Sequence, residues 1–336
     1  MSSRGPLVVV GDVLLDIDVQ GRADRCSPDA PVPVVDVATR EFRPGGAGLA
    51  ALLATADSDE VILIGGFGAD AAAERLRALL AGRVELAELR LHGTTVCKER
   101  IRAVGPCAGG PGPVDRQPED PGTDPAQRPV PITRLDYGDG HIADDEALPG
   151  SVRSALRSAG SILVADYGRG VAAHPQLLEL LAELAADIPI VWDPHPRGGT
   201  PVRGAALATP NRAEAAAFVP GWPDFGNRAR ELTGRWGTRA VVVTLGGDGA
   251  VFYRRGSREF LPIPVPARLR PAPGADTCGA GDRFSAAAAA ALNDGHGLAY
   301  AVRHAVDSAA EFVCAGAASG MRLARRPHPA RHLRAL

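Results

Sequence analysis

The sequence predicts an α/β fold in which helices cover both faces of a mostly parallel sheet. Short apolar, β-branched runs alternate along the chain with longer helical segments, which is the pattern of strand–helix–strand units. A polar cluster follows almost every apolar run, as expected where parallel strands end at a ligand-binding edge. The chain of 336 residues is long enough for one large α/β domain or for two domains.

The apolar runs predict the strands of the main sheet. Runs rich in Val, Ile and Leu without alternation are typical of strands buried on both faces. They lie at 7–10, 61–64, 162–165, 188–192, 206–208 and 240–244. Helices are expected at 47–56, 71–80, 145–158, 175–186 and 301–315. In 175–186, leucines at helical spacing form one apolar face, so this helix should cover the sheet.

Two segments interrupt the alternation and predict a second, smaller β-layer. Residues 18–43 alternate in polarity without a helical period, and 94–103 and 132–137 have strand character, as in a long hairpin. The tip of that hairpin, 107–131, is rich in Pro, Gly and Asp, which predicts a disordered insertion. We therefore expect a core of 1–11, 46–92 and 140–325, a lid of 12–45 and 93–139, and a solvated basic tail of 326–336.

Composition excludes several classes of function. Lys and Arg total 37 against 39 Asp and Glu, so no strong field for nucleic acid or a membrane surface is expected. Lys98 is the single lysine and lies outside any GxxxxGK[ST] pattern, which excludes a P-loop kinase. The five cysteines are odd in number and form no CxxC pair, so neither a disulfide framework nor a zinc site is expected. We expect a cytoplasmic protein without a signal or membrane-spanning segment.

The stretch 271–292 predicts the reactive part of the molecule. A loop containing Gly279 and Gly281 leads into an Ala-rich helix, whose first N–H groups lack internal partners and attract anions. Asp282 stands beside this anion pocket, where it would repel a phosphate, so another role is needed. A carboxylate that accepts the proton of an attacking hydroxyl fits phosphoryl transfer. The alternative is that Asp282 only caps its helix.

Polar clusters follow the other predicted strands and should meet at one edge of the sheet. Asp12 and Asp16 follow the first strand, and Asn211 and Glu214 suit a phosphate and magnesium role, because Mg²⁺ on a nucleotide needs only one or two carboxylates. Further clusters lie at 166–170, 193–198 and 244–249.

One face of the strand expected at 94–103 carries three cations, Lys98, Arg100 and Arg102. Two interpretations are open: a binding surface for a substrate phosphate, or an exposed edge strand kept soluble by charge.

The segment DTCGAGDRF at 276–284 resembles the DTxGAGDxF signature of the ribokinase/PfkB-type carbohydrate kinases. The resemblance implies a ribokinase-like three-layer α/β/α core with a mostly parallel sheet and a small β-sheet lid. It also implies ATP and Mg²⁺ as cofactors and leaves a monovalent cation open. Asp282 would be the catalytic base, and the amides of Gly279, Ala280 and Gly281 the anion hole. Arg283 replaces the usual small residue, either to contact phosphate or to point to solvent.

Other motifs extend the resemblance. NRAE at 211–214 matches the family's NxxE motif, which implies that Asn211 and Glu214 serve the magnesium and phosphate end of the site, Glu214 acting indirectly on the metal. TLGGDG at 244–249 resembles the nucleotide-binding loop, which implies roles for Thr244, Gly246 and Gly249. Asp16, Gly45 and Gly46 match the sugar-contacting aspartate and di-glycine of the family.

Within this family, CSPDAPVPVVDV at 26–37 and RPGGAG at 43–48 resemble the bacterial heptose 7-phosphate kinases. These phosphorylate the anomeric hydroxyl of D-glycero-β-D-manno-heptose 7-phosphate to give the 1,7-bisphosphate. The resemblance implies that Lys98, Arg100 and Arg134 hold the sugar phosphate. The full set of expected substrate-binding residues is Asp12, Asp16, Gly45, Gly46, Lys98, Arg100, Arg134 and Asp166.

Three departures from that subgroup leave the sugar open. Leu49 replaces an asparagine, His195 replaces a lysine with Arg197 nearby, and the insertion lies in the lid. The alternatives are a kinase for a different sugar, sugar phosphate or nucleoside, and a non-catalytic regulator that binds sugar or nucleotide. The family also implies a homodimer formed through the lid.

Overall fold

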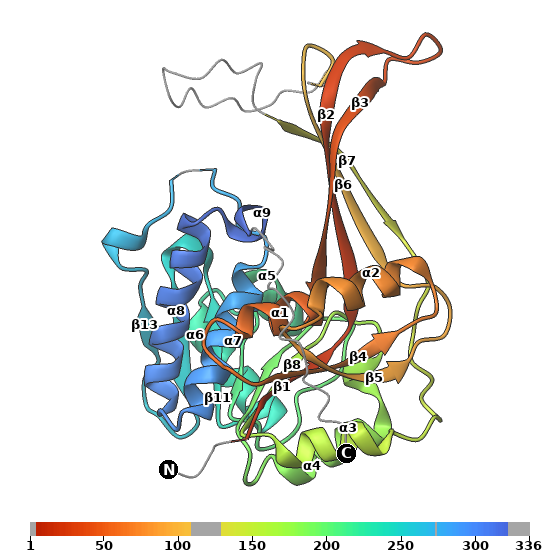
Figure 1. Ribbon diagram of the computed structural model, residues 1–336. Helices are drawn as coiled ribbons and strands as arrows, with labels where there is room; N and C mark the ends of the chain where they lie inside the picture. The colour runs from red at the N-terminus through yellow and green to blue at the C-terminus, as the bar shows by residue number, and fades with distance from the viewer. Residues whose placement is uncertain (1–4, 109–128, 273, 322–336) are drawn as a thin grey trace.

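The computed structural model describes residues 5–108, 129–272 and 274–321 (Figure 1). The large sheet has nine strands in the order β13-β12-β11-β10-β9-β8-β1-β4-β5. Within this order, the neighbouring strands from β11 through β1 to β5 all pair in parallel. Strands β12 and β13 add an antiparallel edge next to β11. The strands are β1 (Leu7–Gly11), β4 (Val61–Phe67), β5 (Glu85–Arg90), β8 (Ser161–Ala165), β9 (Ile190–Asp193), β10 (Leu207–Ala208), β11 (Ala240–Thr244), β12 (Ala250–Arg254) and β13 (Leu261–Ile263).

Helices cover both faces of this sheet, which confirms the predicted three-layer architecture. Along β1, Leu7 and Val9 face one layer while Val8 and Val10 face the other, as the period of two requires. The first layer holds α1 (Ala47–Ala54), α2 (Ala71–Leu80), α7 (Ala280–Asn293) and α8 (Leu298–Cys314). The second holds α3 (Gly150–Ser158), α4 (Pro175–Leu184), α5 (Arg212–Phe218) and α6 (Phe225–Trp236). A short helix, α9 (Ala317–Gly320), follows α8.

A separate four-stranded sheet projects from the core in the order β3-β2-β6-β7 (Figure 1). Its strands are β2 (Val13–Cys26), β3 (Pro33–Gly46), β6 (Cys97–Val104) and β7 (Val130–Tyr137). Only Asp12 separates β1 of the core from β2 of this sheet, and Gly46 ends β3 directly before α1. Asp12 and Gly46 are therefore the points at which the chain leaves and re-enters the core.

Several elements differ from the prediction. The helix expected at 145–158 begins at Gly150, because Pro149 disfavours helix in the residue before it. The strand expected at 188–192 begins at Ile190, after Pro189. Strands β5, β12 and β13 and helices α5, α6 and α9 were not predicted. The expected insertion lies largely in 109–128, outside the described residues, as does the tail at 326–336.

Candidate active site

Helix α7 begins at a glycine in the left-handed conformation. Gly279 is the N-cap with φ 83°, and no side chain caps the helix. A Cβ at this position would lie 3.0 Å from Leu49 Cδ2, so Gly279 is required by both conformation and space. At Gly281 a Cβ would meet no atom within 4 Å, so this glycine leaves open space in front of the helix terminus. Of the predicted anion-hole amides, Ala280 N–H already donates to Thr277 O at 3.1 Å.

Asp282 is buried three positions into α7, with 7% of its surface exposed. The hydroxyl of Tyr167 donates a hydrogen bond to its Oδ1 at 2.5 Å. Burial raises the pKa of Asp282 to about 7, and the nearby Asp16 also raises it, while the Tyr167 hydrogen bond and Lys98 lower it. Since Gly279 is the N-cap and no side-chain cap is present, the helix-cap alternative for Asp282 is wrong.

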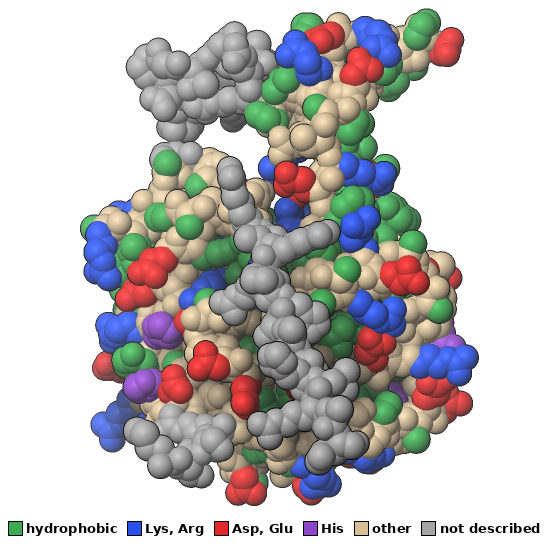
Figure 2. Space-filling view, viewed as in Figure 1, with side chains coloured by type: hydrophobic (Ala, Val, Ile, Leu, Met, Phe, Trp, Pro, Cys, Tyr) green, Lys and Arg blue, Asp and Glu red, His purple; other side chains and the backbone are tan. Residues whose placement is uncertain are grey.

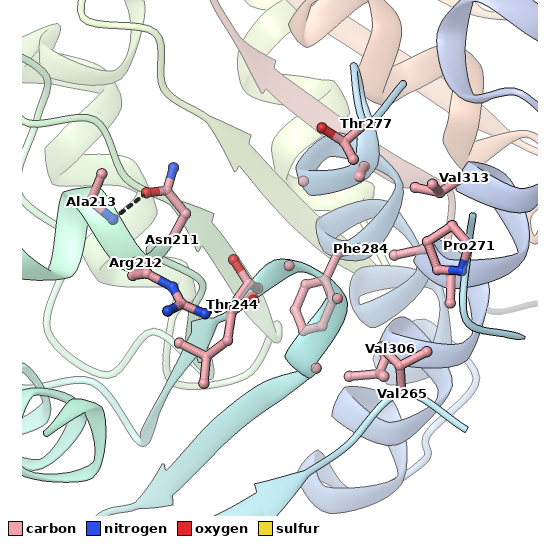
Figure 3. A pocket seen from close by; sticks show the side chains of 18 residues that line it. Asn211, Arg212, Ala213, Thr244, Val265, Pro271, Thr277, Phe284, Val306 and Val313 are labelled. Atoms are coloured by element: carbon pink, nitrogen blue, oxygen red, sulfur yellow. Dashed lines mark hydrogen bonds between the residues drawn. The ribbon is translucent and has the colours of Figure 1, made fainter. Parts of the chain in front are cut away.

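A cavity of about 500 Å³ opens beside this helix terminus (Figure 3). All four residues predicted to bind the nucleotide line it, together with Ala280 and Gly281 of α7. Its far wall is apolar and comes largely from α7 and α8, which suits a flat heterocyclic base. The apolar residues of the wall are Val265, Pro271, Phe284, Val306, Ala309, Ala310 and Val313.

Backbone conformation shapes the loop on the opposite wall. Gly246 and Gly249 have φ of 61° and 93°, which only glycine adopts readily, and a Cβ at Gly246 would meet no protein atom within 4 Å. Thr244 ends β11 and pairs with Asn211 in an isolated parallel bridge. The cavity therefore joins the ends of two strands to the positive end of α7.

The NRAE motif forms a reciprocal cap at the start of α5. Asn211 Oδ1 accepts hydrogen bonds from the amides of Ala213 and Glu214 at 2.9 and 3.0 Å, the first drawn in Figure 3. Glu214 Oε2 accepts one from the Asn211 amide at 2.8 Å. Burial raises the pKa of Glu214. The motif thus has a structural role.

Two further predicted carboxylates hold loops together at the sheet edge. Asp12 accepts hydrogen bonds from the amides of Tyr167, Arg169 and Val171 at 2.9–3.1 Å, and so anchors the loop after β8. Asp166 accepts from the amides of Gly168 and Gly199 at 2.8 and 2.7 Å. Burial raises the pKa of Asp166 to about 6, and Asp12 adds to the shift. The oxygens of these two carboxylates already accept backbone hydrogen bonds, so a sugar hydroxyl that binds there would have to share them as acceptors.

The four-stranded sheet, which the sequence predicts to be a lid, carries a second set of charges near the same edge. Asp16 on β2 lies opposite Lys98 on β6 and is 3.3 Å from Arg100 Nη1. Asp16 Oδ1 and Arg100 Nη1, the two atoms of this ion pair, are both buried, and neither makes a hydrogen bond with a described residue. Gly45 lets β3 pass close to this carboxylate, because a Cβ there would lie 2.8 Å from Asp16 Oδ2. Buried polar atoms without a hydrogen bond are rare, which marks this cluster as a candidate ligand site.

The structure excludes one of the two interpretations of the cationic strand. Strand β6 lies between β2 and β7, so the edge-strand explanation for its charges is wrong. Lys98 has no ion pair with any described residue, and its Nζ lies 5.3 Å from the ring centroid of Tyr167. Arg134 on β7 instead makes two hydrogen bonds of 2.6 Å to Asp136. Figure 2 shows cationic and acidic side chains interspersed around the base of this sheet.

Arg283 neither contacts the anion site nor points to solvent. Its side chain is part-buried, with 12% of its surface exposed, and forms an ion pair with Asp57, beyond the end of α1, with a second contact of 3.1 Å between Nη2 and Oδ1. Both predictions for this residue are wrong, because the first turn of α7 directs it against α1. The pair ties α7 to α1.

Sequence reasoning missed Tyr167 and Asp193. Asp193 ends β9, accepts a hydrogen bond from Thr209 Oγ1 at 3.1 Å, and has a pKa raised well above its ordinary value by burial and by Glu214 and Asp282. Both residues lie in polar clusters that directly follow predicted strands, and that position is the feature of the sequence from which a role in the site could have been predicted.

The part of the chain described here contains no group of three or more His, Cys, Asp or Glu able to hold a metal. None of its helices is both long and apolar enough to span a membrane.

Comparisons with known proteins decide the family. Residues 178–323 match the pfkB family of carbohydrate kinases. The chain is 45% identical to the bifunctional protein HldE of Streptomyces coelicolor over 95% of its own length. A Nitrosococcus oceani protein of the same name is 33% identical over 86% of the chain. The chain carries a PfkB-family carbohydrate kinase domain. The predicted family, and with it the class of phosphotransferases that act on an alcohol group, is confirmed.

The HldE relatives are longer than the region matched. The chain covers 62% of the Streptomyces protein and 56% of the Nitrosococcus protein. Among solved structures, Arabidopsis thaliana ribokinase complexed with ribose and ATP superposes with a TM-score of 0.66 at 19% identity, covering 94% of this chain and 95% of that one. Escherichia coli phosphofructokinase-2 in complex with potassium gives 0.62 at 18% identity, covering 92% and 93%. These similarities confirm the ribokinase-like fold of the PfkB-family domain.

Proposed function

We propose that this protein transfers the terminal phosphoryl group of ATP to the anomeric hydroxyl of a heptose 7-phosphate, giving the 1,7-bisphosphate. One observation carries the proposal: the buried carboxylate of Asp282 lies at the same helix terminus whose Ala280 and Gly281 line the nucleotide cavity. The base and the phosphate site are thus adjacent, as in-line transfer requires. The heptose assignment rests on the resemblance to HldE proteins.

In this mechanism Asn211, Thr244, Gly246 and Gly249 hold the nucleotide in the cavity, and the Gly279–Gly281 terminus of α7 receives the transferred phosphate. The acceptor hydroxyl loses its proton to Asp282 while its oxygen forms the new bond to phosphorus, and ADP leaves with the electrons of the broken P–O bond. A positive helix end stabilises the charge on the phosphoryl group.

The residues present fit Mg²⁺. Glu214 and Asp193 are acidic groups whose pKa values are raised by burial, and Glu214 also raises that of Asp193, so a cation would relieve their repulsion. Mg²⁺ bound to nucleotide phosphates keeps most of its waters and needs few protein ligands. When bound, the ion would neutralise phosphate charge, with Glu214 supporting it indirectly. A monovalent cation stays a prediction.

On the sugar side, Asp16, Gly45 and Gly46 would receive the sugar hydroxyls, and Asp12 and Asp166 would position the loops around them. Lys98 forms no ion pair with a described residue, and Arg100 Nη1 makes no hydrogen bond to one, which supports their role at the sugar phosphate. Arg134 would have to exchange its bonds with Asp136 to join them. The lid, 12–45 and 93–139, would close over the core, 1–11, 46–92 and 140–325, and exclude water.

We also propose that the lid forms a homodimer. Among the described residues, half of the large apolar side chains that are exposed belong to the lid: Val32, Val37, Leu135 and Tyr137. Sedimentation equilibrium of the wild type and of Val37→Asp tests this proposal. A dimer that the substitution converts to monomer is expected, and a wild-type monomer at all concentrations would contradict it.

The test of the activity is ADP release with ATP and Mg²⁺ across a panel of heptose 7-phosphate, sedoheptulose 7-phosphate, ribose, fructose phosphates and nucleosides. Turnover of the heptose phosphate alone is expected. Turnover of another acceptor would retain the kinase mechanism and refute the heptose assignment. No turnover of any acceptor, with nucleotide still raising the thermal midpoint, would favour the non-catalytic regulator.

A further inference from the structure

Tyr167 connects three parts of the site. It follows β8, and its amide donates to Asp12 Oδ2 at 3.1 Å. Its hydroxyl donates to Asp282 Oδ1 at 2.5 Å, and the ammonium of Lys98 from the lid lies 5.3 Å from its ring centroid. Backbone, ring and hydroxyl are therefore each held by a different element.

We infer that Tyr167 is a positioning residue for the base: its hydroxyl holds one oxygen of the Asp282 carboxylate and leaves the other for the acceptor hydroxyl. This inference rests on the proposed function. The Tyr167 hydroxyl is the one hydrogen-bond donor to this carboxylate that the described residues provide. Without it, no hydrogen bond from the described part of the chain would hold the carboxylate in one orientation.

The same contact affects the charge of the base. The ionisable groups that face Asp282 are Tyr167 after β8, Asp16 on β2, Lys98 on β6 and Asp193 on β9. Arg283, the next residue of α7, is turned away to Asp57. Burial and Asp16 raise the pKa of Asp282 to about 7, whereas the Tyr167 hydrogen bond and Lys98 lower it. Loss of the phenol hydroxyl should therefore raise that pKa further and reduce the ionised fraction at neutral pH.

The first test is the pH dependence of kcat/KM in Tyr167→Phe, which removes the hydroxyl and keeps the ring. We expect the acidic limb to move to higher pH and kcat at pH 7 to fall on the order of tenfold, with KM for both substrates little changed. Tyr253→Phe is the matched control, since its hydroxyl donates to Ser257 O at 3.1 Å in the β12 region. If Tyr167 only fills space, Tyr167→Phe would lower stability without moving the acidic limb of the pH profile.

A second readout does not require turnover. Infrared titration follows the protonated carboxyl band of Asp282, identified by its loss in Asp282→Asn. A higher midpoint in Tyr167→Phe than in the wild type supports the inference, and Lys98→Met should shift the midpoint upward too. An unchanged midpoint in Tyr167→Phe overturns the inference, whether or not a substrate has been found. If the wild type turns over no sugar but the midpoint still shifts in Tyr167→Phe, the proposed function is refuted, while the contact between Tyr167 and Asp282 is supported.

Discussion

The core and the lid hold their parts of the site by different means. In the core, the proposed nucleotide cavity and anion site depend on backbone: left-handed glycines, a helix terminus and the reciprocal cap of Asn211 and Glu214. In the lid, the site depends on long charged side chains such as Lys98 and Arg100 on one strand. Backbone sites are fixed by the fold, whereas charged side chains can be exchanged without changing it. The core should therefore determine the chemistry, and the lid the acceptor.

The largest effect should come from the proposed base, Asp282. Asp282→Asn removes the proposed proton acceptor, so kcat should fall by roughly 10² to 10⁴, while ADP binding measured by calorimetry should be retained because other residues form the cavity. Asp187→Asn, in the turn after α4, is the control and should keep full activity. Near-normal turnover in Asp282→Asn would exclude it as the general base.

Two glycines at the start of α7 should separate stability from catalysis. Gly281→Ala adds a methyl group to open space, so the protein should fold normally while kcat/KM for ATP falls on the order of 10- to 100-fold. Gly279→Ala should instead destabilise the fold by about 1–3 kcal/mol, because it combines a φ of 83° with contact to Leu49. Gly256→Ala, with φ 81° and no atom within 4 Å, is the control for conformation alone. Equal stability loss at Gly279 and Gly256 would show that the Leu49 contact is unimportant.

In the lid, Lys98→Gln should raise KM for the sugar phosphate by about 10- to 100-fold, since a charged hydrogen bond contributes about 1.5–3 kcal/mol. Arg134→Gln should have a smaller effect, because its guanidinium is already bonded to Asp136. Arg25→Gln, which breaks an exposed pair with Asp36 at the lid tip, is the matched control. An effect of Arg134→Gln larger than that of Lys98→Gln would move the phosphate site toward β7.

Removal of the buried carboxylate should also give a pH-dependent gain in stability. The pKa of Asp282 rises from 3.8 to about 7 on folding, so the folded state favours the protonated form. Protonation of Asp282 therefore contributes to the free energy of unfolding. This contribution is fully present below about pH 3.8 and is lost as pH rises through about 7. Asp282→Asn should therefore melt at a higher temperature than the wild type at pH 8, with a smaller difference at pH 5, each kcal/mol appearing as about 2–4 °C. A pH-independent difference in calorimetric Tm would show that Asp282 ionises normally.

The sequence was sufficient for the parts of the site that depend on local structure. The loop and helix around Asp282 and the strand ends at Asn211 and Thr244 could be placed, because each is a local pattern at the end of a strand or start of a helix. Contacts between distant segments could not be predicted: Arg283 and Asp57 are 226 residues apart, and Tyr167 and Asp282 are 115 apart. The internal position of β6 likewise depends on strand order, which hydrophobic pattern does not determine.

The division between core and lid is tested most directly by the KM values for both substrates in Thr244→Val and Lys98→Gln. Thr244 lines the nucleotide cavity, and Lys98 lies on the lid beside Tyr167. The division predicts that Thr244→Val raises KM for ATP alone and that Lys98→Gln raises KM for the sugar phosphate alone. If either substitution raises both KM values together, the two regions do not have separate roles and the division is contradicted.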